Sequence, residues 1–146
     1  VLLIDLPPGT GDIQLTLVKK ACISGAIVVS TPQDVALIDA KKAIGMFQKV
    51  EVPLLGVIEN MSYFQCPHCE ERSDIFSHGG AHKTADALDV PFLAEIPLNI
   101  TIREMTDTGA QEELVRKIDL GFPYRQAATS LLDQLQKKHA KKKQAA

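Results

Sequence analysis

Short apolar runs alternate along the chain with stretches in which apolar residues recur every three or four positions. Four of these runs are rich in branched residues, as strands buried on both faces of a parallel sheet are: residues 1–4, 26–30, 54–58 and 92–96. The stretches between the runs have helical spacing. This alternation predicts an α/β domain in which a parallel sheet is flanked by helices.

Candidate caps and apolar spacing predict where the helices lie. Asp12 is expected to cap a helix over about residues 13–22, which the pair Ser24-Gly25 ends. Thr31 as N-cap and Pro32 at the first helical position are expected to start the next helix. The apolar residues expected to face the core are Leu37, Ala40, Ile44 and Phe47 in this helix, Ala81, Ala85 and Leu88 in a shorter one, and Ala128, Leu131, Leu132 and Leu135 in a last one over about residues 124–142.

The same pattern predicts the domain organisation. Residues 1–123 are expected to belong to one domain that contains all the predicted strands, and residues 124–146 to form a terminal helix with a Lys-rich tail. The chain opens on an apolar run without an initiator Met or a polar lead-in. We therefore expect the polypeptide to begin in mid-domain.

Composition indicates a globular protein and restricts its partners. The 146 residues are 45% hydrophobic and 23% charged, which excludes disorder over most of the length. No apolar run approaches the roughly 18–20 residues that cross a bilayer, so no membrane partner is expected. Residues 1–136 hold 11 Lys and Arg against 18 Asp and Glu, and an acidic body with a basic tail does not predict nucleic-acid binding. Three unevenly placed cysteines favour a reducing compartment, and we expect the cytoplasm.

A first candidate site follows the first predicted strand, because ligands of open α/β sheets bind beyond the carboxyl ends of strands. Asp5 ends an apolar run as a Walker B aspartate does, and such a carboxylate can hold the water shell of Mg²⁺ beside nucleotide phosphates. The turn from Pro7 to Asp12 contains the prolines and glycines that would let backbone N–H groups approach a phosphate. On the residues alone, a plain strand-to-helix turn capped by Asp12 remains open.

A second candidate site is Cys66-Pro67-His68-Cys69, in a polar loop after the third predicted strand. Two thiolates at this spacing can bind one metal ion or one edge of an iron–sulfur cluster, and each such site takes about four ligands. One pair therefore supplies half a site. Alternatives are a zinc site completed by His78 and His82 of the same chain, a thioredoxin-like redox pair, and two unliganded surface thiols.

Other residues that can carry chemistry have structural interpretations. Cys22, near the end of the first predicted helix, is expected to be a small buried apolar residue. His78 precedes a Gly-Gly-Ala turn whose N–H groups could receive an anion, although such a turn alone is a weak signal. The five lysines of residues 137–146 are expected to form a solvated helix end.

Longer stretches of the sequence resemble one family. The resemblance rests on DLPPGTGDIQLTL, STPQDVALIDAKKAIGMFQKVEVPLLGVIENMSYFQCPHC, HGGA and AEIPLNITIRE, and it extends from Val1 to about Ala110. These stretches are similar to the Mrp/ApbC family of iron–sulfur carrier ATPases, deviant P-loop ATPases related to MinD, ParA and the nitrogenase iron protein. The resemblance implies the C-terminal part of a MinD/ParA-like P-loop domain.

The resemblance also implies roles for individual residues. Asp5, as the Walker B acid, and Gly9 would be catalytic, and Pro8-Gly9-Thr10-Gly11 would form the second switch loop. Asn60 would read adenine, since an amide can donate to and accept from the base edge at once. The stretch Pro97-Leu98-Asn99 would form the other wall of the base pocket.

The family's activity gives the cysteine pair a function. Members bind ATP with Mg²⁺, act as homodimers and carry a labile [4Fe–4S] cluster, so the implied partners are apo iron–sulfur proteins and a cluster assembly scaffold. A cluster bridged between two subunits would take Cys66 and Cys69 from each. The competing class is a partner-binding or positioning ATPase of the ParA/MinD kind, with zinc or nothing at the pair.

One part of the family pattern is absent from the sequence. No Gly-x-x-x-x-Gly-Lys-Ser/Thr sequence occurs in these residues, although this loop cradles the β- and γ-phosphates in P-loop ATPases. The family places it before the strand on which this chain opens, which favours an N-terminally incomplete polypeptide. We expect the full protein to hydrolyse ATP and this chain alone not to.

Overall fold

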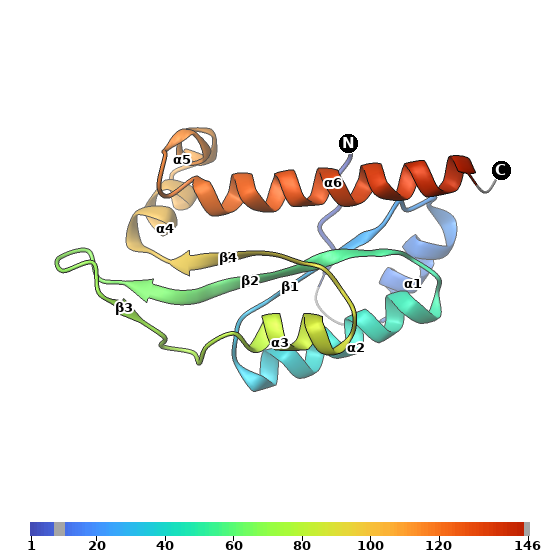
Figure 1. Cartoon of the computed structure of the whole chain (residues 1–146), viewed down its shortest axis with the longest axis horizontal. Coiled ribbons are helices and arrows are strands. Elements are labelled where there is room, and N and C mark those ends of the chain that lie inside the picture. Colours follow the sequence, from blue (N-terminus) through green and yellow to red (C-terminus); the bar gives the residue numbers. More distant parts are fainter. Residues whose placement is uncertain (8–10, 145–146) are drawn as a thin grey trace.

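The computed structural model describes residues 1–7 and 11–144 of the chain (Figure 1). Its helices and strands are, in chain order, α1 (Asp12–Lys20), β1 (Ala26–Ser30), α2 (Asp34–Lys49), β2 (Leu54–Gln65), β3 (Arg72–Ser73), α3 (Gly80–Ala87), β4 (Phe92–Leu98), α4 (Ile100–Asp107), α5 (Gln111–Arg116) and α6 (Phe122–Gln144). Helices and strands alternate through most of the chain, which confirms the predicted α/β class.

The long strand β2 is the centre of the sheet. It pairs in parallel with β1 and with β4, and its last residues pair antiparallel with the short β3. The three parallel strands correspond to three of the predicted apolar runs. β1 has the predicted bounds, whereas β2 continues to Gln65 instead of ending at Ile58.

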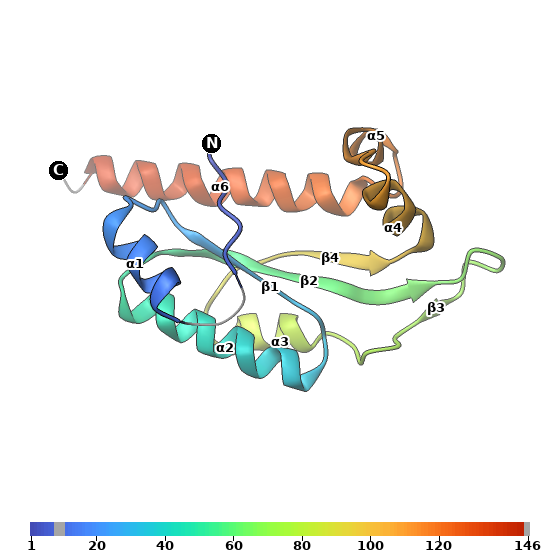
Figure 2. The ribbon, with the colours of Figure 1, turned by 180° about the vertical axis from the view of Figure 1, so that it is seen from behind.

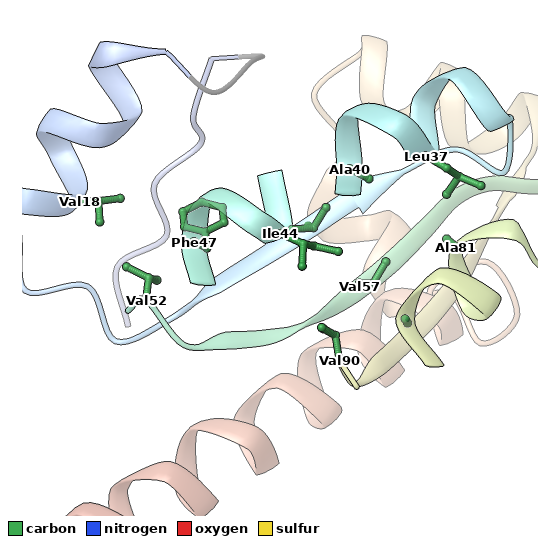
Figure 3. Packing of buried hydrophobic residues seen from close by; sticks show 11 residues of the cluster. Val18, Leu37, Ala40, Ile44, Phe47, Val52, Val57, Ala81 and Val90 are labelled. Atoms are coloured by element: carbon green, nitrogen blue, oxygen red, sulfur yellow. The ribbon is translucent and has the colours of Figure 1, made fainter. Parts of the chain in front are cut away.

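Helices cover both faces of the sheet (Figures 1 and 2). Helices α2 and α3 lie on one face, and α6 runs along the other against β4 and β2. The predicted stripe of α2 is confirmed, because all four of its members are buried: Leu37, Ala40, Ile44 and Phe47. Figure 3 shows this stripe beside Val57 of β2 and Ala81 of α3. Burying each large aliphatic side chain contributes about 1.5–3 kcal/mol, so this contact holds α2 and α3 on the sheet.

The face that α6 turns to the sheet differs from the prediction. Ala127 is buried, whereas Ala128 and Leu132 are exposed, and Leu131 and Leu135 are half-buried. Each residue along a helix turns it by about 100°, so a shift of one position, as from Ala128 to Ala127, moves the buried stripe to a different face of the helix. None of the helices in the described part of the chain combines the length and the apolar character that crossing a membrane requires.

Residues 1–7 form no strand, so the prediction of a strand over residues 1–4 is wrong. The four apolar side chains of this segment, Val1, Leu2, Leu3 and Ile4, are 97%, 83%, 74% and 50% exposed. A buried strand needs neighbours that bond its backbone N–H and C=O groups, and no described strand pairs with this segment. An apolar run becomes a strand only where the fold provides those neighbours.

The first two helices also start at other residues than predicted. Gly11 is the N-cap of α1, so Asp12 lies in the first turn, where its charge complements the helix dipole. α2 begins after Gln33, because the Thr31 hydroxyl donates to Gln33 Oε1 at 2.8 Å and does not cap the backbone. The short helices α4 and α5 were not predicted, since six to eight residues carry little periodic signal.

Candidate functional site

The expected base pocket lies where two neighbouring parallel strands end. Asn60 of β2 pairs in register with Ile96 of β4, the residue before Pro97. Pro97 and Leu98 end β4, and Asn99 follows as the N-cap of α4. The sheet thus brings these predicted residues to one edge, and their part in base recognition stays a prediction.

The two asparagines of this group differ in their hydrogen bonds. Asn99 Oδ1 accepts from the N–H groups of Thr101 at 2.8 Å and Ile102 at 3.2 Å, which caps α4 and uses both lone pairs of the oxygen. Asn60 Oδ1 accepts only from the N–H of Met61, at 2.9 Å, among the bonds of the described residues. Met61 has a left-handed backbone, with φ of 54°, where the register of β2 against β4 shifts. Asn60 Oδ1 therefore has a second lone pair that no described residue uses.

Of the predicted phosphate-side residues, only Asp5 and Gly11 lie in the described part of the chain. Asp5 is exposed in the irregular segment before α1, and no hydrogen bond or strand pair of the described residues joins it to Asn60. Three residues of the predicted switch loop lie outside the described part of the chain: Pro8, Gly9 and Thr10. Gln14 of α1, which is buried, donates through Nε2 to the carbonyl of Pro7, the residue before that loop, at 2.8 Å.

The turn between β2 and β3 carries the cysteine pair. Glu70 N–H donates to the Cys66 carbonyl at 2.9 Å, and Cys66 N–H donates to the Glu71 carbonyl at 3.0 Å. These bonds close the backbone around the Cys-x-x-Cys sequence, and this hairpin end projects beyond β4 (Figure 1). Cys66 is half-buried and Cys69 is exposed. The hairpin therefore presents two thiols at its tip.

Backbone donors lower the pKa of the Cys66 thiol below its ordinary value. The largest contribution is a hydrogen bond from the N–H of His68, followed by one from the N–H of Cys69 and one from the Cys69 thiol, and burial opposes them. Donors aimed at sulfur favour the thiolate, which is the form that binds metal. The turn is thus built to hold a negative sulfur next to a second one.

The two histidines that could close a zinc site within one chain have other partners. His78 Nδ1 lies 2.9 Å from Arg72 Nη2, and His82 Nδ1 lies 3.1 Å from Asp86 with its ring against Phe92. In the described part of the chain, no cluster of three or more His, Cys, Asp or Glu side chains could hold a metal ion. Among the described residues, no third ligand therefore joins Cys66 and Cys69, and their part in binding a metal or a cluster stays a prediction.

Cys22 does not lie where it was predicted. It is exposed, and it follows the end of α1 at Lys20 instead of lying within the helix. The expectation of a small buried residue was wrong because the helix ends two residues earlier than its apolar pattern suggested. That Cys22 is dispensable for metal or cluster binding stays a prediction.

A buried carboxylate that the sequence pattern did not single out lies next to Asn60. Glu59 is 0% exposed, and its Oε2 accepts from the N–H of Ala81 at 2.7 Å while its Oε1 accepts from the Ser62 hydroxyl at 2.6 Å. Ala81 is in the first turn of α3. The acceptor at this helix N-terminus is therefore a side chain of the protein itself, and an acid directly after the predicted apolar run 54–58 was its only sequence signal.

The glycines before Ala81 allow this contact. Gly79 is the N-cap of α3 in the left-handed region, with φ of 65°, which favours glycine. A Cβ on Gly80 would lie 2.7 Å from the Pro32 carbonyl oxygen and 2.6 Å from a methyl group of Leu37. The turn that the sequence marked as a weak anion site thus serves close packing of α3 on α2 and β2.

Residues 1–135 match the family model of the NUBPL iron-transfer P-loop NTPase. The chain is 53% identical over 109 residues to the iron–sulfur cluster transfer protein NUBPL of Dictyostelium discoideum, which covers 75% of this chain and 34% of that protein. It is 49% identical over 135 residues to the iron–sulfur cluster carrier protein of Escherichia coli K12, which covers 92% of this chain and 37% of that protein. The chain thus spans about a third of the length of these relatives.

Solved structures agree on the fold. The nucleotide-binding protein of Archaeoglobus fulgidus, solved in complex with ADP, is 40% identical and superposes with a TM-score of 0.68 over 79% of this chain and 46% of that one. The cell division ATPase MinD of Pyrococcus furiosus superposes with a TM-score of 0.57 over 75% and 43%, at 24% identity. The predicted MinD-like α/β fold is confirmed. With the family match over residues 1–135 and identities near 50%, this chain belongs to the NUBPL iron-transfer family of P-loop NTPases.

Proposed function

We propose that this chain is the cluster-binding part of an ATP-dependent iron–sulfur carrier. Two copies would hold one [4Fe–4S] cluster, as cargo, between the Cys66 and Cys69 thiols of each. The main support is the turn between β2 and β3, which presents two thiols, lowers the pKa of one of them and has no third ligand among the described residues. A cluster needs about four ligands, so a second copy supplies the missing two.

The nucleotide would bind at the carboxyl edge of the sheet. Asn60 and the stretch from Pro97 to Asn99 would contact the base, which is supported by their register on β2 and β4 and by the lone pair that Asn60 keeps. Asp5 would hold Mg²⁺ through water, and its exposed carboxylate suits an ion that retains most of its hydration shell. Gly9 of the switch loop would approach the terminal phosphate. ATP hydrolysis would need the Walker A loop, so this chain alone is expected to be inactive.

The proposed recipients are apo iron–sulfur proteins, and the cluster would come from an assembly scaffold. Relatives are named as transfer and carrier proteins, which supports delivery. Three free cysteines, two of them offered as ligands, suit a reducing compartment, and we propose the cytoplasm.

The test is anaerobic reconstitution with ferrous iron and sulfide. Wild-type chain should gain a brown, oxygen-sensitive chromophore, and Cys66→Ser or Cys69→Ser should abolish its visible absorbance because each removes a ligand from the half-site. Cys22→Ser is the matched control, since this exposed thiol lies outside the hairpin, and it should leave the chromophore intact.

Zinc binding would contradict the proposal. If the purified chain held stoichiometric zinc that His78→Ala or His82→Ala released, a single-chain zinc site would replace the carrier function. An empty cysteine pair in reconstituted wild type would favour a partner-binding ATPase of the MinD kind.

A further inference from the structure

Arg72 makes contacts that the proposed function does not use. It lies in β3, opposite Gln65 of β2, directly after the turn that carries Cys66 and Cys69. Its guanidinium group reaches four side chains: Nε is 3.0 Å from Asp74 Oδ1, Nη2 is 2.9 Å from His78 Nδ1, Nη1 is 3.7 Å from Glu95 Oε2, and Cζ is 4.1 Å from the centre of the Tyr63 ring.

These four partners come from three different parts of the fold. Tyr63 belongs to β2, Glu95 belongs to β4, and Asp74 and His78 lie in the segment that leads from β3 to α3. Asp74 Oδ2 also lies 3.6 Å from His78 Nδ1, so these two partners meet the guanidinium group side by side. One side chain therefore links the outer strand of the hairpin to the central strand, to its neighbour and to the approach to α3.

The hairpin has little else to hold its outer strand. β3 is two residues long, and it pairs with β2 only through Phe64 with Ser73 and Gln65 with Arg72. Two-stranded hairpins are marginally stable in water without further packing. The sheet holds one side of the turn, since Phe64 of β2 also pairs with Leu98 of β4, and the position of the β3 side therefore depends on side-chain contacts at its base.

The set of partners requires arginine. A guanidinium group is a planar fork with five donors and a flat face, so it can serve two carboxylates and a ring nitrogen while it stacks on an aromatic ring. An ammonium group on lysine is a point charge that cannot reach all four. Because arginine only donates, His78 Nδ1 accepts in this contact.

We propose that Arg72 is a positioning residue for the cluster ligands. Its contacts hold the hairpin in one orientation on the sheet and so fix the direction in which Cys66 and Cys69 face a second chain. Ligand sets work only when their support holds them within about half an ångström of the required geometry. We call the contacts of Arg72 with Tyr63, Asp74, His78 and Glu95 the clamp. What the thiols bind rests on the proposed function, whereas the effect of the clamp on the hairpin can be measured in the metal-free chain.

The first measurement is amide hydrogen exchange of the metal-free chain. Arg72→Ala should speed exchange of the Cys66 and Glu70 amides, which close the turn, by roughly three- to tenfold, the range expected for losing exposed ion pairs and a cation–π contact. Arg72→Lys should fall between Ala and wild type. Arg103→Ala is the matched control, because Arg103 makes similar exposed pairs with Asp107 and Glu104 on α4, and it should leave the hairpin amides unchanged.

The second measurement uses chain reconstituted with ferrous iron and sulfide. Arg72→Ala should alter the visible circular dichroism of the cluster and shorten its half-life in an iron chelator by a similar factor, with Arg72→Lys again intermediate. Adding Glu95→Gln to Arg72→Ala should cause little further loss, because both changes remove the same contact.

The outcomes separate the clamp from the proposed function. Faster exchange at the hairpin in a chain that never binds a cluster would support the clamp and contradict the carrier function. If the chain binds a stable cluster, but Arg72→Ala changes neither the exchange of the hairpin amides nor the dichroism and half-life of the cluster, the clamp is contradicted and the proposed function is not. Faster exchange throughout α2 and α3 would also overturn it, since Arg72 would then act on the whole fold.

Discussion

At the scale of single residues, Glu59 decides how α3 meets the sheet. Its carboxylate is buried and accepts from the first turn of α3 and from Ser62 on its own strand. Burying a carboxyl group costs free energy unless its oxygens are hydrogen-bonded, and both oxygens of Glu59 accept a hydrogen bond here. Glu59 adjoins Asn60, so the contact also steadies the strand end on which the expected base pocket depends.

We predict that Glu59→Ala lowers the free energy of unfolding by about 3 kcal/mol, because it leaves the Ala81 N–H and the Ser62 hydroxyl buried without a partner. Glu112→Ala is the control: Glu112 is exposed and pairs with Arg116 at 3.6 Å, so its loss should cost at most about 0.5 kcal/mol. Urea unfolding followed by circular dichroism measures both. Equal losses would show that Glu59 contributes no more than a surface charge.

The Cys66 thiol should lose its proton at a lower pH in the folded chain than in the unfolded chain. The N–H groups of His68 and Cys69 favour the thiolate and lower its pKa, so the folded state binds this proton less tightly than the unfolded state. This contribution to stability is present above the ordinary pKa of a thiol and is lost as pH falls through the lowered one.

Alkylation of Cys66 by iodoacetamide measures that shift in metal-free chain. Because the thiolate is the reactive form, the midpoint of rate against pH should lie lower in the native chain than in urea-unfolded chain. Comparing midpoints rather than rates removes the effect of partial burial on access. A native midpoint equal to or above the unfolded one would contradict the hydrogen bonding of the turn.

At the scale of elements, α2 shows how one helix divides between core and solvent. Its stripe of Leu37, Ala40, Ile44 and Phe47 packs against β1, β2 and α3, while Val35 and Ile38 are exposed. The helix thus carries apolar residues on both sides, and only those at the helical spacing of the core contribute to packing.

A pair of identical substitutions tests this division. Ile44 is 1% exposed and Ile38 is 53% exposed on the same helix. Ile44→Ala should lower the free energy of unfolding by about 2–5 kcal/mol, because it removes buried methyl groups and leaves a cavity. Ile38→Ala should change it by less than about 1 kcal/mol, as measured by urea unfolding. Similar losses of stability at both positions would contradict the division of α2 into a buried and an exposed side.

At the scale of the whole molecule, two features affect association. The hairpin tip presents two thiols, and under the proposed function a cluster that takes two more from a second copy would link cluster binding to dimerisation by mass action. The exposed apolar side chains of residues 1–4 offer a second, non-specific route to association. The two routes differ in whether they depend on the cluster.

We predict that reconstituted chain is dimeric with about one cluster per two chains, and that chelation returns it to monomers because the bridge is lost. Light scattering with iron analysis, before chelation and after a second reconstitution, measures this linkage. Aggregates driven by residues 1–4 would persist through chelation and shrink in Leu2→Lys/Leu3→Lys chain. A cluster-loaded monomer would contradict the bridging model.

Much of the local structure was determined by the sequence. Runs of branched apolar residues located β1, β2 and β4, and helical spacing located the buried stripe of α2, because side-chain period alone decides which face can be buried. The spacing of Cys66 and Cys69 was enough to predict a turn with two neighbouring thiols, since two residues only three positions apart lie near each other in almost any tight loop. The family resemblance followed from the same residues.

Tertiary structure decided whatever depends on neighbours distant in the chain. Residues 1–4 have the composition of a buried strand but stay unpaired, because pairing needs adjacent strands. The Ala81 N–H in the first turn of α3 donates to the carboxyl group of Glu59, which is 22 positions away in the chain. Arg72 gathers partners from β2, β4 and the approach to α3, and no local pattern predicts such a set. Contacts of this kind arise only once the sheet has formed, since the sheet sets the distances between its strands.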